Sequence, residues 1–190
     1  RNFVITMSPS MDILVSSNLE RLLFSLCNEN GAMVQDLMLQ LSKAEEYKVN
    51  AHIKEGLRNF PGGYASESAT AEAIRQIYKQ SGYVIDTHTA VAYSVYRKYR
   101  EMNSNDKTKT IIVSTASPYK FTAAVMESID SKYSGLDDFE LVNEMGKLLK
   151  TELPKGIKDL DKRPILHRTV CEKHEMKEQV EKILTLNILQ

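Results

Sequence analysis

The chain's first strong apolar pattern lies over residues 17–26. Four leucines recur at the i, i+3, i+4 and i+7 spacing of one helix face: Leu19, Leu22, Leu23 and Leu26. Ser17 and Glu20, three residues apart, form a capping box, the reciprocal pair that starts a helix. The pattern therefore predicts a helix that begins at Ser17 as its N-cap.

Similar periodicity and local start signals predict six further helices. Their expected spans are 33–48, 67–80, 87–102, 118–128, 137–150 and 173–184. Ser66 is the expected cap of the 67–80 helix, and Asp86 or Thr87 that of the next. Ser117 followed by Pro118 is a strong start for the fourth. Residues 50–63 show no such pattern, and we expect them to be irregular.

Short apolar runs between these helices predict strands. Residues 3–5 and 166–170 are two of them, while 83–85 is too short for a clear prediction. Ile111, Ile112 and Val113 are consecutive and apolar, which is typical of a strand buried on both faces in a parallel sheet. The alternation predicts an α/β fold with parallel strands flanked by helices and with a helical insert.

The start of the first predicted helix carries groups that bind anions. Its first amides have no partner inside the helix, and the helix dipole favours an anion in front of them. Two hydroxyls, a carboxamide and a guanidinium lie at the same place: Ser16, Ser17, Asn18 and Arg21. The alternative is purely structural, since most capping boxes only start helices.

Thr115 is a second candidate, because it follows the predicted buried strand at 111–113. Open α/β sheets bind ligands at the carboxyl ends of their strands, where a hydroxyl can meet a ligand. The alternative is that Thr115 merely ends the strand.

Composition narrows the class of protein. Lys and Arg number 25, as do Asp and Glu, so the formal charge of zero argues against a general electrostatic grip on nucleic acid or anionic membrane. Cys27 and Cys171 lack CxxC spacing and indicate reduced thiols in a cytoplasmic protein. The apolar runs are shorter than a membrane span, and the isolated histidines, His88 among them, suggest no metal site.

Three stretches, in the same order, resemble threonine synthase. They are Met7–Leu23 (MSPSMDILVSSNLERLL), Gly82–Ala92 (GYVIDTHTAVA) and Ser114–Phe121 (STASPYKF). The resemblance implies the carboxyl-terminal portion of a type II pyridoxal-phosphate enzyme, an α/β fold. It places residues 1–30 and 103–190 in the large cofactor-binding domain and 31–102 in a mostly helical insert. The implied reaction converts O-phosphohomoserine and water to threonine and phosphate.

The resemblance also implies roles for individual residues. Thr115 matches the hydroxyl that meets the pyridine nitrogen of pyridoxal phosphate. The residues at the first helix start match the family motif there, and we assign them to the phosphate or carboxylate of the substrate: Ser16, Ser17, Asn18 and Arg21. Lys120 is a candidate second anion contact.

The chain departs from the family pattern in four places. Ser117 stands where the family often has His, and Thr87 where it has Pro. The Schiff-base lysine motif and the Gly/Asn-rich loop for the cofactor phosphate belong to the family's N-terminal part and have no match here. We therefore expect an N-terminal part of the enzyme to lie outside this chain and the chain alone to be inactive.

Two other functions fit the same residues. One is a non-catalytic module with an α/β fold that binds phosphate or a nucleotide at the helix starts of Ser17 and Ser117. The other is an interaction domain, which would show a large exposed apolar patch.

Overall fold

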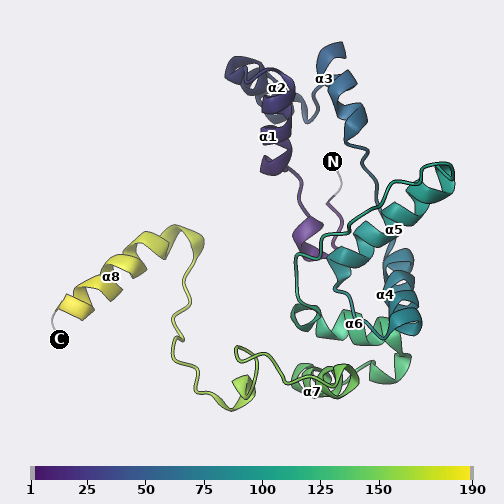
Figure 1. Ribbon diagram of the computed structural model, residues 1–190. Coiled ribbons are helices and arrows are strands. Elements are labelled where there is room, and N and C mark those ends of the chain that lie inside the picture. Colours follow the sequence, from purple (N-terminus) through teal and green to yellow (C-terminus); the bar gives the residue numbers. More distant parts are fainter. Residues whose placement is uncertain (1–2, 189–190) are drawn as a thin grey trace. The chain divides into compact units, whose positions relative to one another are not determined.

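The computed structural model describes residues 3–188, with side chains described over residues 3–185. Contacts divide the chain into two compact units, Arg1–Glu152 and Leu153–Gln190, which are described separately. Figure 1 shows the course of the chain through its helices. The predicted division into 1–30, 31–102 and 103–190 stays a prediction.

The first unit begins with a small group of helices. After the short 3-10 turn η1 (Pro9–Met11) come α1 (Ser17–Leu26), α2 (Gly31–Ala44), α3 (Ala51–Gly56) and the turn η2 (Leu57–Asn59). Helix α1 packs against α2 and α3. Four buried side chains form the core of this group: Leu23, Cys27, Leu37 and Ile53.

The sequence prediction for residues 50–63 is wrong. Residues 50–63 were expected to be irregular, but α3 and η2 lie within them. The Asn50 side chain accepts a hydrogen bond from the Ile53 amide at 2.9 Å and so caps α3. Ile53 is buried in the core of the group, and its packing supplies the stability that a helix this short lacks by itself.

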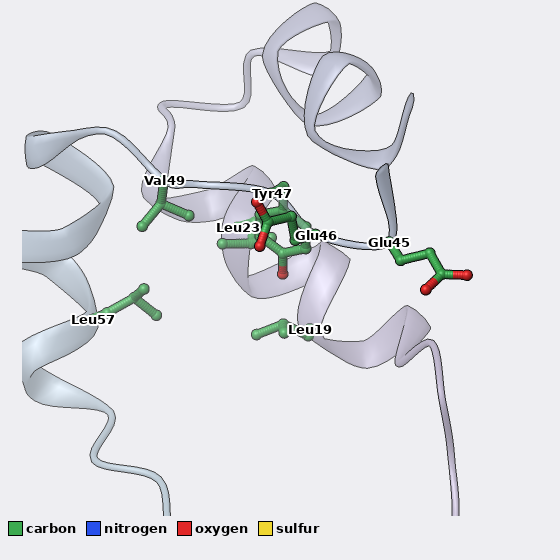
Figure 2. A pocket seen from close by; sticks show the side chains of 7 residues that line it. All are labelled: Leu19, Leu23, Glu45, Glu46, Tyr47, Val49 and Leu57. Atoms are coloured by element: carbon green, nitrogen blue, oxygen red, sulfur yellow. The ribbon is translucent and has the colours of Figure 1, made fainter. Parts of the chain in front are cut away.

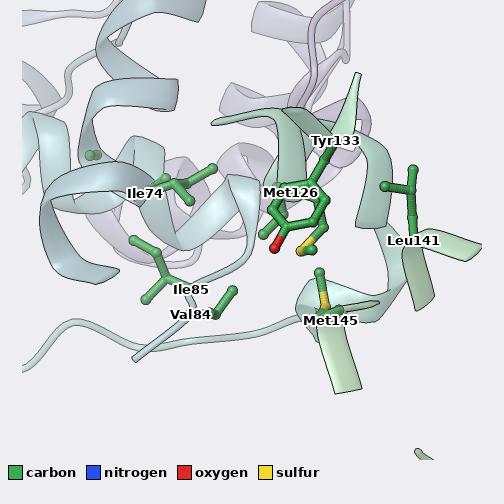
Figure 3. Close-up of a cluster of buried hydrophobic side chains, with 10 residues drawn as sticks. Ile74, Val84, Ile85, Met126, Tyr133, Leu141 and Met145 are labelled. Carbon is green, nitrogen blue, oxygen red and sulfur yellow. The ribbon is translucent and has the colours of Figure 1, made fainter. Parts of the chain in front are cut away.

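The second group of helices holds the larger core. It comprises α4 (Glu67–Ser81), α5 (Thr87–Met102), the turn η3 (Pro118–Lys120), α6 (Thr122–Ile129), the turn η4 (Ser131–Tyr133) and α7 (Asp138–Leu149). Helix α4 packs on α5 and α6, and α6 packs on α7. Figure 3 shows the core side chains of these elements gathered in one interior, among them Ile74, Met126 and Met145.

Most of the predicted helix starts are confirmed. Ser66 caps α4 by accepting from the Ala69 amide at 3.2 Å, and Asp86 caps α5 by accepting from the His88 and Thr89 amides. Gly82, with φ of 70°, ends α4 in the left-handed conformation that glycine adopts at no steric cost.

The predicted capping box at Ser17 is wrong by one residue. Ser16 is the N-cap of α1, and Ser17 is already helical. The Ser16 side chain makes no capping hydrogen bond. Because two serines stand side by side, local pattern could not decide which of them leaves the helix.

The helix predicted over 118–128 is interrupted. Pro118–Lys120 form η3, and α6 starts only at Thr122. Phe121, with φ of −133° and ψ of 40°, lies outside the helical region between them. The Thr122 hydroxyl donates to the Tyr119 carbonyl at 3.0 Å and closes the break.

The predicted parallel strands are not formed within residues 3–188. Ile111 and Val113, expected to be buried on both faces, are 88% and 70% exposed. A strand is held by hydrogen bonds to a neighbouring strand, and no strand neighbour is present in the described residues. These segments are therefore extended but unpaired.

The second unit holds the 3-10 turns η5 (Leu160–Lys162) and η6 (Lys173–Glu175) and the helix α8 (Met176–Ile188). The helix predicted over 173–184 is thus confirmed with a 3-10 first turn. The strand predicted over 166–170 is not formed, and Val170 is exposed. No helix in residues 3–188 is long and apolar enough to cross a membrane.

Candidate functional site

The start of α1 exposes the groups that we predicted to bind an anion. Ser16, Ser17, Asn18 and Arg21 all have exposed side chains. Arg21 donates a hydrogen bond from its guanidinium to the Asn18 side-chain oxygen, so these two polar groups lie together. Since no side chain caps the helix, its first amides remain available to a ligand.

Thr115 lies two residues before Ser117, which caps the short turn η3, and Lys120 is the last residue of that turn; both side chains are exposed. The Ser117 side chain accepts a hydrogen bond from the Tyr119 amide at 3.3 Å, and the Ser117 carbonyl accepts one from the Lys120 amide at 3.0 Å. Within residues 3–188, no hydrogen bond or ion pair joins Thr115 or Lys120 to the start of α1. The grouping of these side chains into one site stays a prediction.

A hollow of about 500 Å³ lies beside α1 (Figure 2). Its lining consists of Leu19, Leu23, Glu45, Glu46, Tyr47, Val49 and Leu57. Figure 2 shows Glu45 pointing away from the other labelled side chains. Apolar walls and carboxylates do not suit a phosphate ester, because a like charge repels it. This hollow is therefore not the predicted anion site.

A polar cluster, buried at the start of α5, brings side chains from separate stretches of the chain together, and its centre is Asp86. The Asp86 side chain is fully buried at the start of α5. One carboxylate oxygen, Oδ1, accepts from the His88 amide at 2.9 Å and from the Thr89 amide at 3.3 Å. The other, Oδ2, accepts from the Thr89 hydroxyl and, at 3.4 Å, from the Ser114 hydroxyl. We call Asp86, His88, Thr89 and Ser114 the Asp86 cluster.

His88 extends the Asp86 cluster to the loop before α1. Its Nε2 accepts a hydrogen bond from the Ser10 amide at 3.0 Å. A backbone N–H can only donate, so Nε2 is unprotonated and the proton of the neutral ring sits on Nδ1. Nδ1 then donates to Asp86 Oδ1 at 3.1 Å. The Phe121 ring packs on the imidazole with 4.7 Å between centroids.

The surroundings of Asp86 favour its charged form. Burial works to raise the pKa of this carboxyl, but the hydrogen bonds from the Thr89 hydroxyl and from the His88 and Thr89 amides outweigh burial. The net result is a pKa below its ordinary value of 3.8. Asp86 is therefore a buried carboxylate that is held by hydrogen-bond donors.

The Asp86 cluster joins all three stretches that resemble threonine synthase. Ser10 belongs to Met7–Leu23, Asp86 and His88 belong to Gly82–Ala92, and Ser114 belongs to Ser114–Phe121. Each contact links residues that are 25 or more positions apart. The stretches meet in space although long segments separate them in the chain.

Sequence reasoning missed this cluster. It treated His88 as an isolated residue in a first helical turn and Asp86 as one of two possible caps. The available signal was the crowding of Asp86, Thr87, His88 and Thr89, a run of polar residues between two apolar stretches that proves to be buried. Contacts to Ser10 and Ser114 depend on tertiary structure and leave no local pattern.

Comparison with known proteins gives one consistent result. The family model described as the C-terminal part of threonine synthase matches residues 89–183. Threonine synthase from Saccharomyces cerevisiae is 33% identical over 173 residues, which cover 83% of this chain and 33% of that protein. Threonine synthase-like 1 from Homo sapiens is 36% identical over 134 residues, which cover 70% of this chain and 17% of that protein.

Solved structures extend the similarity to the fold. A crystal structure of threonine synthase from yeast superposes with a TM-score of 0.76 at 30% identity, over 97% of this chain and 37% of that one. Threonine synthase with bound PLP from Brucella melitensis gives a TM-score of 0.60 at 28% identity, over 80% and 31%. The chain spans between about a sixth and just over a third of the length of these relatives.

Proposed function

The chain belongs to the threonine synthase family, by its match to the C-terminal family model, and from this premise we propose that it is the C-terminal part of a threonine synthase. The proposed enzyme converts O-phospho-L-homoserine and water to L-threonine and phosphate, in threonine biosynthesis. It uses pyridoxal phosphate and works in the cytoplasm.

The observation that carries the proposal is the meeting of the three motifs at Asp86. Ser10 leads along the chain to the open start of α1, and Ser114 directly precedes Thr115. The cluster therefore connects the segment with the proposed anion contacts to the segment with the proposed cofactor contact. Such an arrangement suits a substrate that carries an anionic group at one end and reacts at the other.

Each proposed site residue has a role that follows from its chemistry. Ser16, Ser17 and Asn18, with the first amides of α1, hold the phosphate or carboxylate of the substrate, and Arg21 forks onto it. Thr115 hydrogen-bonds the pyridine nitrogen of the cofactor, which supplies an electron sink when bound. A neutral hydroxyl would not keep that nitrogen protonated. Lys120 adds a second cationic contact for the anion.

The lysines fit the cofactor poorly as covalent anchors. A lysine that forms a Schiff base needs burial or a cationic neighbour that lowers its pKa. Every lysine in residues 3–185 is exposed. Hydrogen bonds to Glu144 and Asp159 raise the pKa of Lys147 and Lys162, the opposite direction. The described residues thus offer Thr115 to the ring but no anchor, and we propose that the chain alone is inactive.

Exposed apolar segments support the proposal that another part of the enzyme packs on this chain and completes the fold. Phe3, Val4 and Ile5 are exposed, and so are Ile111 and Val113. A groove of about 820 Å³ runs between α5 and the extended segments 61–64 and 110–113. Its lining is mostly apolar, and unpaired extended backbone borders it. We propose that the N-terminal part of the same enzyme pairs with these segments and covers the groove.

The test is an activity assay of the full-length product of the gene that encodes this chain, beside residues 1–190 alone. With pyridoxal phosphate and O-phosphohomoserine, the full-length protein should form threonine and phosphate in equal amounts, and residues 1–190 should form neither. Absence of threonine from the full-length protein, together with tight nucleotide binding by residues 1–190 in calorimetry, would replace the proposal by the phosphate- or nucleotide-binding module.

Arg21→Ala tests the anion site in the same assay. Loss of a charge-assisted hydrogen bond of about 1.5–3 kcal/mol should lower kcat/KM by about 10- to 100-fold. Arg58→Ala is the matched control, since Arg58 is also exposed but is paired with Glu55 near α3. Equal effects of the two substitutions would remove Arg21 from the site.

A further inference from the structure

The loop before α1 is a braced unit that can be moved as one piece. Thr6 donates to both carboxylate oxygens of Asp12, from its amide at 2.8 Å and from its hydroxyl at 2.7 Å. The Ser8 amide donates to the Thr6 hydroxyl at 3.1 Å, and η1 closes the far side. Residues 6–12 therefore hold their own shape. The position of this loop on the molecule depends on its contacts to α4 and α5.

Two contacts dock this loop. The Met7 amide donates to the exposed carboxylate of Glu67 on α4 at 3.0 Å, and the Ser10 amide donates to the buried His88 ring at 3.0 Å. The contact to Glu67 is exposed, so water screens it and it contributes little. The contact from Ser10 is part-buried and ends on the buried His88 ring, so water screens it less. His88 is thus the principal polar attachment of the loop.

The second end of the same network holds the segment before Thr115. Ser114 donates to Asp86 Oδ2 at 3.4 Å, and its hydroxyl oxygen lies 3.0 Å from that of Thr89. From Ser10 the path runs through the imidazole to Oδ1 of Asp86, and from Oδ2 to Ser114. One carboxylate therefore connects two segments that carry different parts of the proposed site.

We propose that Asp86 and His88 are positioning residues that fix the loop before α1 relative to the Ser114–Thr115 turn. This inference rests on the proposed function for its catalytic consequence. Ser10 and Ser16 are six positions apart, a distance of at most about 20 Å in extended chain, so the docked loop limits where the anion contacts of α1 can lie relative to Thr115. Without the His88 contact, the loop can shift. The anion contacts of α1 and Thr115 are then no longer held in a fixed position relative to each other.

The free-energy cost of burying the Asp86 carboxylate also supports a positioning role for this residue. A buried carboxylate must be fully hydrogen-bonded, and an apolar residue of similar size would fill the space without that demand. Asp86 already caps α5 through two amides, as an exposed cap such as Ser66 does for α4 with one. The contacts to His88 and Ser114 go beyond capping, and they are the ones that reach other segments.

The experiment compares two substitutions at His88 in the full-length protein. His88→Phe keeps a ring against Phe121 but removes the acceptor for the Ser10 amide. His88→Gln keeps an acceptor oxygen at about the position of Nε2. Ser66→Ala, which removes the cap of α4, is the control for a general loss of stability. Hydrogen exchange is followed by mass spectrometry on peptides from residues 6–14, together with kcat/KM for O-phosphohomoserine.

We expect exchange in residues 6–14 to rise about tenfold in His88→Phe, which corresponds to one lost hydrogen bond. The value of kcat/KM should fall by a similar factor. Both readouts should stay within about threefold of wild type in His88→Gln and Ser66→Ala. Unchanged exchange in His88→Phe would overturn the proposal, and so would an equal fall of kcat/KM in Ser66→Ala. If wild type shows no turnover, the proposed function fails while the exchange readout still decides whether His88 holds the loop.

Discussion

The helices α4 to α7 and the extended segments at 3–5 and 110–113 both carry apolar side chains, but those of the helices form a buried core and those of the extended segments are largely exposed. In the helices, Ile74, Val125, Met126 and Met145 are fully buried against each other (Figure 3). In the extended segments, Ile5, Ile111 and Val113 face solvent.

The difference follows from how each kind of element satisfies its backbone. A helix makes its hydrogen bonds within its own segment, so α4 to α7 need only each other to bury an apolar face. A strand needs hydrogen bonds from a neighbour. The described residues supply no neighbouring strand, so the same apolar character stays exposed and marks where we propose that another part of the enzyme binds.

The largest effect should come from the buried side of this comparison. Met126→Ala removes a fully buried side chain from α6 and should lower the free energy of unfolding by about 2–5 kcal/mol. Met102→Ala is the matched control, because Met102 is 77% exposed at the end of α5, and it should change stability by less than about 0.5 kcal/mol. Urea unfolding followed by circular dichroism measures both. Similar losses in the two variants would contradict the assignment of the core.

An intermediate effect on the free energy of unfolding is expected at Asp86. This buried carboxylate at the start of α5 accepts a hydrogen bond from Ser114, which follows the extended segment 110–113. The pKa of Asp86 is lowered in the folded chain, so its carboxylate adds stability at pH values above 3.8, and this stability is lost as the pH falls through the lowered value. Asp86→Asn should therefore cost about 1–2 kcal/mol near pH 7, because a charged acceptor is lost.

The cost of Asp86→Asn should shrink as the pH falls below 3.8, where this carboxyl becomes protonated in the unfolded chain, and should be lost once the pH passes below the lowered pKa of the folded chain. Urea midpoints of wild type and variant at pH 7 and pH 3 give the comparison. A difference between them that grows toward acid pH would show that the charged carboxylate does not stabilise the fold.

The smallest effect on residues 1–190 should come from the exposed segments. Replacing Ile111 and Val113 together by Thr should change the unfolding free energy of this chain by less than about 1 kcal/mol, since both side chains are exposed. In the full-length protein the same double substitution should lower the melting temperature by several degrees, because these side chains are then proposed to be covered. An equal response in both proteins would remove the proposed interface from this segment.

The features that could be predicted from the sequence are those that depend on interactions between neighbouring residues. The cap at Ser66, and Asp86 as one of two possible caps, could be predicted because each depends on hydrogen bonds within a few residues. The local sequence could not decide between Ser16 and Ser17 as the N-cap of α1, since both residues are competent caps.

Other features depend on distant residues and could not be predicted in this way. Ile111 and Val113 have the composition of a buried strand, but their burial depends on a partner segment that local sequence does not specify. The role of His88 required knowing that Ser10, 78 positions earlier, donates to it. The resemblance identified the three motifs, and only the fold showed that they meet at Asp86.

We propose that this chain carries contacts to the substrate and to the ring of the cofactor, while the covalent anchor of the cofactor lies elsewhere in the enzyme. The most direct test is to incubate the full-length protein with pyridoxal phosphate, reduce it with borohydride and map the modified lysine by mass spectrometry. We expect a single labelled lysine, and we expect it outside residues 1–190. Specific labelling of one lysine within residues 1–190 would contradict it.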